Sequence, residues 1–574
     1  MTRLWNDPAD FADEMIEGFV AANGRYVRRV TGGVVRSTSS AAGQVAVVIG
    51  GGSGHYPAFG GLVGQGLAHG AAMGNLFASP STQQVYAVAK AADQGGGVFF
   101  SYGNYAGDVL NFDVAEERLR ADGVDSATVT VTDDVASAPL SERHRRRGIA
   151  GDLTVFRAAG AAAEAGYDLA AVTAVAAKAN DRTRSFGVAF SGCTLPGARA
   201  PLFAVPPGRM AVGLGIHGEP GISEADIPTA DELAELLVSR LLDERPEGAD
   251  GRVIPLLNGL GSLKYEEMFV IYRRIARLLD AHGLEVIDPH VGEYCTSFDM
   301  AGTSLTLFWL DDELATLWDT PVDTPAYRRG SVVARQRSDA SAMADTAEVV
   351  MLGDAVSQGV AVTVLAAVQA IVETVDAHVD ELGRLDSVAG DGDHGIGMQR
   401  GSHAALAAAK AAAAGGAGAG TVLERAADAW SDKAGGTSGA LWGVILSALA
   451  SKLGDAGAPD ASAIAAGVAA GARNVMDYGK AEVGDKTLVD ALVPFSGALT
   501  RAVDMGASLG NAWAVAADAA VSSAAATADL LPRMGRARTH GQNSVGTPDP
   551  GAHSLALIVA AVGSTLAASG EDTP

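Results

Sequence analysis

The sequence predicts an α/β half of two lobes followed by an all-α domain. Over the first 330 residues, short apolar runs that end in polar, glycine-containing loops alternate with alanine-rich helical stretches, which is typical of an open α/β sheet. Between Pro321 and Asp345 the composition becomes polar and basic. After this stretch apolar residues recur at helical spacing and strand patterns disappear. A length of 574 residues agrees with about three folding units.

The first lobe is predicted to span residues 1–190. Its apolar runs are short enough to be buried strands, and each ends in a loop that carries glycine or aspartate. Ligands of open α/β sheets bind at the carboxyl ends of the strands, so these loops are candidate sites. The predicted strands cover residues 45–49, 97–100 and 127–131, and a predicted helix covers residues 81–92.

The second lobe is predicted to span residues 191–330, with strands at 210–216, 253–257 and 304–310. A linker over residues 331–348 follows, because this part of the chain is polar and basic. The remaining residues, 349–574, are predicted to form the all-α domain. Its helical spacing is clearest in three segments, 361–382, 440–453 and 488–503.

The composition excludes several classes of protein. The net charge is −25, which argues against a nucleic-acid partner because phosphate backbones need clustered Lys and Arg. The two cysteines, Cys193 and Cys295, form no disulfide framework, which fits a reducing compartment. The N-terminus carries acidic residues where a signal peptide needs an apolar run. The apolar run from Leu555 to Leu566 is too short to span a bilayer. We therefore expect a soluble, cytoplasmic protein.

An acidic loop follows the first predicted helix of the all-α domain. Asp386, Asp391 and Asp393 lie within eight residues, and glycines break the helix between them. If the loop turns the three carboxylates toward one point, they need a hard cation such as Mg²⁺ to offset their repulsion. A solvated acidic loop or a calcium site is an equally plain interpretation, although the EF-hand pattern is not met.

A second polar cluster, Gly435 to Gly443, leads into a predicted helix. Backbone N–H groups at a helix N-terminus, with the hydroxyls of Thr437 and Ser438 beside them, suit a phosphate group. An ordinary helix cap explains the same pattern, and the Walker A spacing is absent. Two further polar islands, 484–487 and 535–551, interrupt the helical pattern.

Three polar side chains of the first half follow predicted strands. His55 ends the run Gly50 to Gly54, Asp108 follows the strand at 97–100, and His217 stands between two glycines. The flanking glycines leave His217 sterically open, which suits contact with a ligand. Each position also has a structural explanation, such as a tight turn or a buried, hydrogen-bonded histidine. Their recurrence at strand ends favours a site.

These motifs together resemble the dihydroxyacetone kinase family, in its single-chain, ATP-dependent form. The resemblance covers nearly the whole chain, and its motifs occur in the family's order. In the first half they are GGGSGH (50–55), GNLFASPS (74–81), NYAGDVLNF (104–112), DDVA (133–136), RRGIAG (146–151), GIHGEPG (215–221) and TSFDMAGTSLTL (296–307). In the second half they are GDGDHG (390–395), GGTSGALWG (435–443), GDKTLVDAL (484–492) and DPGA (549–552).

The resemblance implies a ketose-binding α/β half and a helical-barrel domain that binds ATP. His217 matches the histidine that adds to the substrate carbonyl and gives a covalent hemiaminal. Asp108 matches the carboxylate that accepts the hydroxyl proton, and His55 matches a residue that hydrogen-bonds the substrate. Gly52, Ser53 and Gly103 are the remaining residues assigned to the ketose site.

On the nucleotide side, the resemblance implies that Asp386, Asp391 and Asp393 hold Mg²⁺, with two ions expected. Phosphoryl transfer then depends mainly on positioning and on neutralising charge. The resemblance further implies a homodimer in which halves of different chains face each other. The residues assigned to ATP are His394, Gly436, Thr437, Ser438, Arg536 and Asp549.

Two positions depart from the family pattern. Many members have a lysine where Gly103 stands, and many have a glutamate where Tyr56 stands. Both positions adjoin the implied ketose site. Loss of the lysine removes a donor and is expected to open volume, which makes the four-carbon ketose erythrulose a candidate substrate beside dihydroxyacetone.

Other functions remain open at this point. Some family members are non-catalytic regulatory proteins, some cyclise FAD at the ATP site, and some are subunits of a phosphotransferase system. The metal aspartates and the fused ATP domain of this chain favour the ATP-dependent kinase.

Overall fold

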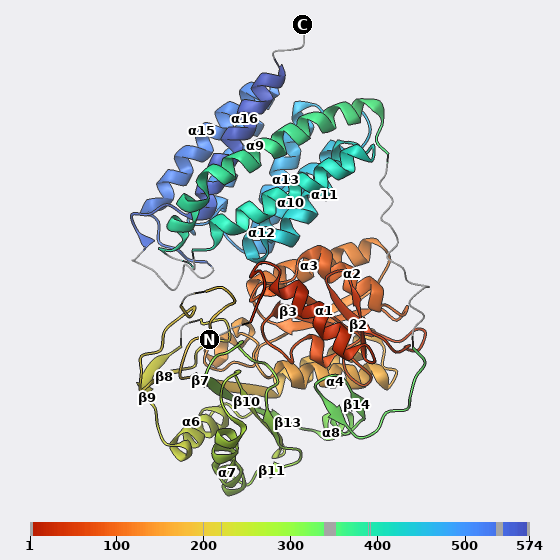
Figure 1. Cartoon of the computed structure of the whole chain (residues 1–574), viewed down its shortest axis with the longest axis vertical. Coiled ribbons are helices and arrows are strands. Elements are labelled where there is room, and N and C mark those ends of the chain that lie inside the picture. Colours follow the sequence, from red (N-terminus) through yellow and green to blue (C-terminus); the bar gives the residue numbers. More distant parts are fainter. Residues whose placement is uncertain are drawn as a thin grey trace. The chain divides into compact units, whose positions relative to one another are not determined.

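The computed structural model describes residues 4–198, 200–219, 221–337, 352–388, 390, 392–534 and 544–570. The chain divides into two compact units, residues 1–344 and residues 345–574, which are coloured red to green and green to blue in Figure 1. Asp391 and Arg536, two of the predicted site residues, lie outside the described residues.

The first sheet of the first unit has six strands in the order β1-β2-β4-β3-β5-β6. Strand β3 runs parallel to β4 and β5, and β5 runs parallel to β6, as the predicted α/β sheet requires. The strands are β1 (Val27–Val30), β2 (Gly33–Arg36), β3 (Ala46–Ser53), β4 (Gly70–Leu76), β5 (Val98–Gly103) and β6 (Ser126–Val131).

Helices cover both faces of this sheet. Ala46 and Val48 of β3 pack with α2 (Thr82–Ala92) and α3 (Ala106–Ala121), whereas Val47 and Ile49 face the side of α4 (Asp152–Glu164) and α5 (Leu169–Asp181). This alternation follows from the two-residue period of a strand. The carboxyl ends of β3 and β5 are left for the loops that carry His55 and Asp108.

The sequence predicts a loop at the glycine run, but in the structure Gly50 to Ser53 belong to strand β3. Gly50 pairs with Ala72 of β4, and a side chain on Gly50 would come within 2.6 Å of the Ala72 carbonyl oxygen. Glycine is therefore needed here for close strand packing rather than for a turn.

The second sheet has the order β11-β10-β13-β7-β8-β9, with β12 also paired to β10, and is mostly antiparallel. Helices α6 (Ala230–Leu242) and α7 (Tyr265–Ala281) pack on it. The strand predicted at 210–216 ends early, because Gly213 has a φ of 74°. The strands are β7 (Thr183–Ala189), β8 (Arg209–Val212), β9 (Ser223–Asp226), β10 (Arg252–Gly259), β11 (Glu285–Val286), β12 (His290–Gly292) and β13 (Gly302–Trp309).

The basic stretch after the second sheet is partly built into the first unit. Helix α8 (Asp312–Trp318) is followed by the hairpin of β14 (Val322–Asp323) and β15 (Arg328–Arg329). Arg329 forms an ion pair with Asp288 at 2.5 Å, and Arg335 forms one with Glu164 at 2.7 Å. These contacts explain why arginines gather in a segment that otherwise reads as a linker.

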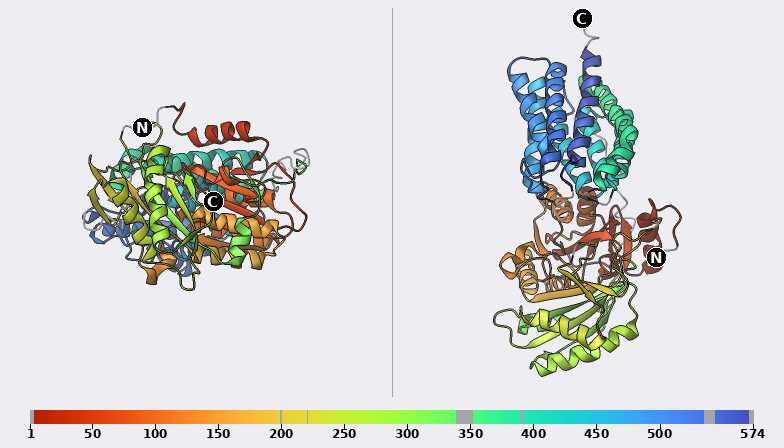
Figure 2. Two further views of the ribbon diagram at one scale, coloured as in Figure 1. Left: turned by 90° about the horizontal axis from the view of Figure 1, so that it is seen from below. Right: turned by 90° about the vertical axis from the view of Figure 1, so that its left-hand side faces the viewer.

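The second unit is helical, as predicted, and its helices pack side by side (Figure 2). Each helix from α9 to α15 packs against the next one, and α16 packs against both α15 and α9, so the ring closes. The core of this unit is rich in alanine, which permits close helix packing. The helices are α9 (Ala355–Asp386), α10 (His394–Ala414), α11 (Ala419–Ala434), α12 (Gly436–Leu453), α13 (Ala461–Gly479), α14 (Val489–Asp504), α15 (Leu509–Ala526) and α16 (Pro550–Gly570).

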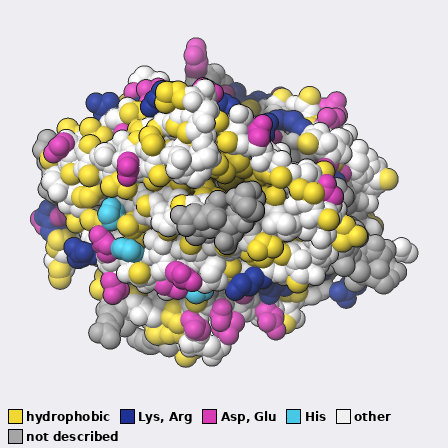
Figure 3. All heavy atoms as spheres, turned by 90° about the horizontal axis from the view of Figure 1, so that it is seen from above, with side chains coloured by type: hydrophobic (Ala, Val, Ile, Leu, Met, Phe, Trp, Pro, Cys, Tyr) yellow, Lys and Arg dark blue, Asp and Glu magenta, His cyan; other side chains and the backbone are white. Residues whose placement is uncertain are grey.

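Two helices of this ring, α9 and α16, are long and apolar enough to cross a membrane by length and composition. The apolar stretch of α16 is thus longer than its sequence prediction. Both helices also pack against their neighbours in the ring. On the face shown in Figure 3, Lys and Arg side chains are scattered among Asp and Glu.

Candidate active site

Two histidines from distant parts of the first unit meet at the end of β3. His55 lies two residues after the end of strand β3, and His217 lies in the loop after β8. Their Nε2 atoms are 2.9 Å apart. The Nδ1 atom of His55 lies 2.8 Å from the carbonyl oxygen of Thr296, and the Nδ1 atom of His217 lies 3.0 Å from Oε1 of Glu219.

These contacts assign the protons of the pair. A carbonyl or carboxylate oxygen only accepts, so both Nδ1 atoms carry hydrogen and donate. The Nε2–Nε2 contact then needs one proton between the two rings. Burial, and secondly the charge of His217, lower the pKa of His55 to about 3. His55 is therefore neutral near physiological pH, and its Nε2 lone pair serves as the acceptor of this contact.

Glu219 anchors His217 twice, through the ring Nδ1 and through the backbone N–H, which donates to Oε2 at 3.1 Å. Burial acts to raise the pKa of Glu219, but His217 and then Arg147 outweigh it and hold that pKa well below its usual range. Arg147 is itself fixed by Asp134, to which its Nη2 donates at 2.7 Å. A carboxylate is thus kept ionised beside the imidazole.

Aromatic rings enclose the histidine pair. The Phe77 ring stacks on His55 with centroids 4.9 Å apart, and the Tyr105 ring meets His217 edge-on at 4.6 Å. Phe77 has a φ of 52°, in the left-handed region. Side chains on Gly52 or Gly54 would come within 3 Å of Ala78 or Phe77. The glycines of the GGGSGH motif therefore let the wall of the site approach closely.

Asp108 lies in the first turn of α3 and is 8% exposed. Its Oδ1 atom has no hydrogen-bond partner among the residues that the structure describes. Burial raises the pKa of Asp108 to about 6, although a hydrogen bond from Ser79 and the charge of His217 act against the rise. A carboxylate with this pKa is suited to general-base work near neutral pH.

The other ketose-site candidates have structural contacts of their own. The Ser53 hydroxyl donates to the carbonyl oxygen of Gly74 at 2.6 Å. A Cβ atom on Gly103 would lie 3.1 Å from the Tyr105 ring. Tyr105 therefore already occupies the space that the loss of the lysine was expected to open. Tyr56 is half exposed, and its ring packs against Phe19 at 6.0 Å.

In the second unit, Asp386 ends α9 and Asp393 precedes α10. Oδ2 of Asp386 accepts a hydrogen bond from the N–H of Gly392 at 2.9 Å, which folds the loop back over the helix end. Asp393 is exposed. Partial desolvation, and secondly the charge of Asp386, nevertheless raise the pKa of its carboxyl. A like charge that raises the pKa of the Asp393 carboxyl fits a site for a divalent cation.

The loop is joined to the start of α16. His394 Nε2 lies 3.0 Å from the Ser554 hydroxyl, and burial lowers the pKa of His394. Asp549 accepts a hydrogen bond from the Ala552 N–H at 2.7 Å and so caps α16. Desolvation raises the pKa of Asp549 to about 7, with Asp490 adding to the rise.

The same loop adjoins the start of α12. A side chain on Gly397, one turn into α10, would lie 3.6 Å from the carbonyl oxygen of Ala434, directly before Gly435 and Gly436. Thr437 and Ser438 are exposed in the first turn of α12. Three of the predicted nucleotide motifs therefore gather at one end of the helical ring, where hydroxyls, N–H groups and carboxylates can serve a metal-bound phosphate.

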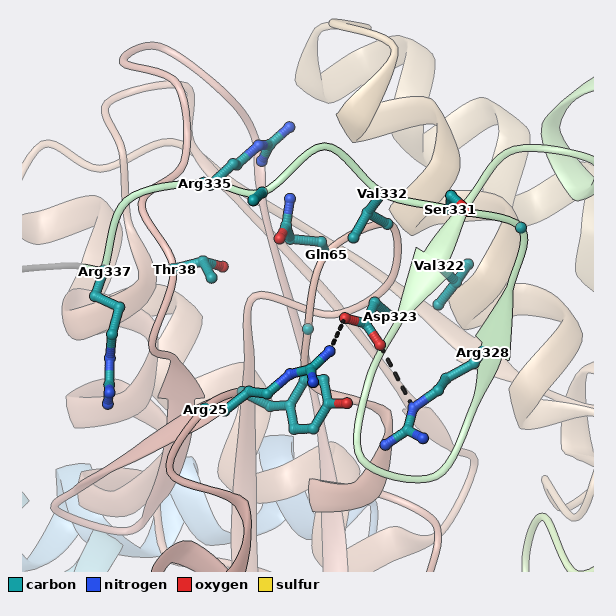
Figure 4. Close-up of a pocket in the computed structure, with 14 residues that line it drawn as sticks. Arg25, Thr38, Gln65, Val322, Asp323, Arg328, Ser331, Val332, Arg335 and Arg337 are labelled. Atoms are coloured by element: carbon teal, nitrogen blue, oxygen red, sulfur yellow. Dashed lines mark hydrogen bonds and ion pairs between the residues drawn. The ribbon is translucent and has the colours of Figure 1, made fainter.

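A further hollow of the first unit lies away from these residues. It has a volume of about 540 Å³ and is bounded by the β14–β15 hairpin and the start of β1 (Figure 4). Arg25 and Arg328 both turn toward Asp323, at 3.0 and 3.4 Å. This hollow contains none of the predicted site residues.

The sequence reasoning missed Glu219, Tyr105, Thr296 and Arg147. All four lie inside the motifs listed above, and Glu219 and Tyr105 also stand two residues from His217 and three from Asp108, so sequence proximity was a signal for these two. Thr296 acts through its backbone and Arg147 reaches Glu219 at 3.7 Å across the fold. Only the tertiary structure could place Thr296 and Arg147.

Comparisons with known proteins find relatives for both parts of the chain. A Dak1 domain matches residues 17–326, and a DAK2 domain matches residues 388–564. An L-erythrulose kinase of Pectobacterium atrosepticum is 59% identical, covering 99% of this chain and 97% of its own. A D-erythrulose kinase of Mycolicibacterium smegmatis is 52% identical over both full lengths. The crystal structure of the C. freundii dihydroxyacetone kinase with AMP-PNP and Mg²⁺ is 30% identical, with a TM-score of 0.53 and 99% of both chains covered.

Proposed function

Since this chain belongs to the dihydroxyacetone kinase family and is a ketose kinase, we propose that it phosphorylates a terminal hydroxyl of erythrulose in preference to dihydroxyacetone, with the ketose held covalently on His217. The observation that carries the covalent step is the pair of Nε2 atoms at 2.9 Å, with Glu219 behind one ring and a buried, neutral acceptor in the other.

The pair supplies a balanced addition. His55 accepts the Nε2 proton of His217, which frees the lone pair to attack the carbonyl carbon. The electrons of the C=O π bond move to oxygen, which takes the proton from His55. The hemiaminal keeps one positive charge on the alkylated imidazole, and Glu219, whose pKa is held low, balances it. The bond selects carbonyl compounds and fixes the terminal hydroxyl in place.

Asp108 is proposed to accept the proton of that hydroxyl as it attacks the phosphorus atom. Its pKa of about 6 keeps it ionised at neutral pH. In the second unit, Asp386 and Asp393, with Asp391, would hold Mg²⁺, and Gly436, Thr437 and Ser438 would contact the phosphates. When bound, magnesium neutralises charge on the nucleotide phosphates, which is what phosphoryl transfer needs.

The preference for erythrulose is supported by the names of the two similar kinases. The relatives differ in the erythrulose enantiomer that their names give, so both enantiomers belong in the assay. We further propose that the enzyme acts as a cytoplasmic homodimer. Light scattering of the purified protein tests the dimer.

The test is a panel of dihydroxyacetone, D- and L-erythrulose, glycerol and FAD, each with Mg-ATP. We expect the highest kcat/KM with one erythrulose enantiomer and no turnover of glycerol. A wild type that favours dihydroxyacetone would reject the substrate preference, and turnover of FAD alone would reject the ketose kinase.

The covalent step is tested with ketose labelled with ¹³C at the carbonyl carbon. In wild type, the bound ketone resonance should be replaced by one of a tetrahedral carbon. His217→Ala should abolish this signal and ketose phosphorylation while Mg-ATP binding is kept. Unchanged activity of His217→Ala would refute the covalent role.

A further inference from the structure

The mechanism leaves one buried carboxyl beside the ketose site unused. Asp152 is the first residue of α4 and is 2% exposed. Its Oδ1 atom has no hydrogen-bond partner in the described part of the chain. A buried polar atom without a partner is costly and calls for an explanation, such as a bound water or a ligand.

A helix-capping role does not explain Asp152. Helix α4 begins after Gly151 with no side-chain cap. Burial, then Asp133, then Asp108 raise the pKa of Asp152 well above its usual value, and no hydrogen bond acts against the rise. Asp133 contrasts with it, because its two oxygens accept hydrogen bonds from Ile149 and Gly151, each at 2.9 Å. Asp133 is a structural brace of the 148–151 loop, and Asp152 is not.

The position of Asp152 links it to the ketose site. A Cβ atom on Gly148 would lie 2.8 Å from Oδ1 of Asp152 and 2.5 Å from the Cα atom of Gly103. The Asp152 carboxyl and the Gly103 backbone therefore both lie against Gly148. The carbonyl oxygen of Gly148 accepts a hydrogen bond from the Tyr105 hydroxyl at 2.9 Å, and the ring of Tyr105 faces His217. The Asp152 carboxyl thus adjoins Gly148 and Gly103, next to the wall of the site that Tyr105 forms.

We propose that Asp152 is a specificity-determining residue, whose carboxyl binds the hydroxyl that a four-carbon ketose carries beyond the three-carbon core. A buried carboxyl oxygen without another partner in the described residues can accept a hydrogen bond from this hydroxyl. Dihydroxyacetone has no group to reach it. This inference rests on the proposed function, because it concerns the same ketose site.

The test uses the full-length enzyme and compares kcat/KM for erythrulose and dihydroxyacetone in wild type, Asp152→Ala and Asp152→Asn. In Asp152→Ala we expect the ratio of erythrulose to dihydroxyacetone to fall about tenfold, the factor that one lost hydrogen bond gives. Asp152→Asn keeps a donor and an acceptor of the same shape and should restore most of the ratio. Asp133→Asn is the matched control, expected to lower thermal stability and to leave the ratio within twofold of wild type.

An unchanged ratio in Asp152→Ala would overturn the proposal, whether the melting temperature rises or falls. It would indicate that the carboxyl binds a structural water instead. If Asp152→Ala does not fold, an unchanged ratio for Asp152→Leu, whose side chain has the same branching and no hydrogen-bonding group, overturns it in the same way, whereas a reduced ratio supports it. Failure of the proposed function is distinguishable, because wild type itself would then favour dihydroxyacetone or phosphorylate neither ketose, whatever the Asp152 variants do.

Discussion

At the scale of single residues, the proposed ketose site contains a buried carboxyl oxygen that has no hydrogen-bond partner in the described residues. Most buried carboxylates of the first unit are bonded, as Asp134 is to Arg147. Asp108 instead leaves one oxygen unpaired, and its pKa rises to about 6. A buried charge without a partner lowers stability, so its retention in the fold points to a catalytic use.

We predict opposite effects of Asp108→Asn on activity and on stability. Because the folded-state pKa is raised above 3.8, protonation of Asp108 stabilises the fold below that value, and this stability is lost as the pH rises through about 6. At pH 7.5 the variant should therefore be more stable, by at most about 3 kcal/mol. It should also lose most ketose phosphorylation. Denaturant unfolding and kinetic assays measure the two effects.

The pH profile gives an independent check. In wild type, kcat/KM for the ketose should fall about tenfold per pH unit below pH 6, as the general base becomes protonated. The residual activity of Asp108→Asn should lack this acidic limb. A variant that is less stable than wild type at pH 7.5, and that keeps the limb, would show that Asp108 is structural.

At the scale of elements, the loop after β8 holds His217 by means of its glycines. Gly218 has a φ of 86°, and a side chain there would meet the Phe203 ring at 2.4 Å. A Cβ atom on Gly215 would lie 2.0 Å from Oε2 of Glu219 and 2.5 Å from Nη1 of Arg147. Gly215 thus provides the space in which the anchor of His217 is assembled.

We predict that Gly215→Ala displaces the Glu219 carboxylate and weakens hemiaminal formation. Loss of one charge-assisted hydrogen bond should lower kcat/KM for the ketose roughly 10- to 100-fold, while the affinity for Mg-ATP stays at the wild-type value. Gly18→Ala is the matched control, because a side chain there meets no atom within 4 Å. Wild-type ketose kinetics in Gly215→Ala would mean that Glu219 is not required.

At the scale of the whole molecule, the proposed ketose site and the proposed nucleotide site lie in different compact units. His55, His217 and Asp108 all belong to the first unit, and the loop of Asp386 and Asp393 belongs to the second. The two binding events should therefore be separable by mutation within one chain.

We predict that Asp393→Asn abolishes Mg-ATP binding and leaves the ketose adduct intact. The carboxylate is exposed at its edge, so without metal the melting temperature should change little. Calorimetric titration with Mg-ATP and ¹³C spectra of the bound ketose measure the two halves of the prediction. A variant that binds Mg-ATP as wild type does would refute the metal assignment, and loss of the adduct would refute the independence of the two sites.

The sequence by itself determined the order of architectures and the positions of the motifs. Periodicity separated the α/β half from the helical half, because strand and helix periods differ and survive in any tertiary context. His55, Asp108 and His217 could be selected because each follows a strand. The run Gly50 to Ser53 was misjudged as a loop, since glycine in a strand depends on what the neighbouring strand brings close.

Only the tertiary structure decided which of these residues meet. His55 and His217 are 162 positions apart, and their Nε2 contact depends on how two sheets pack rather than on local spacing. The same holds for Arg147 behind Glu219 and for Asp152 beside Gly103. Local patterns fix dihedral preferences over a few residues, whereas burial, and with it the pKa of a carboxyl, depends on every atom that displaces water around it.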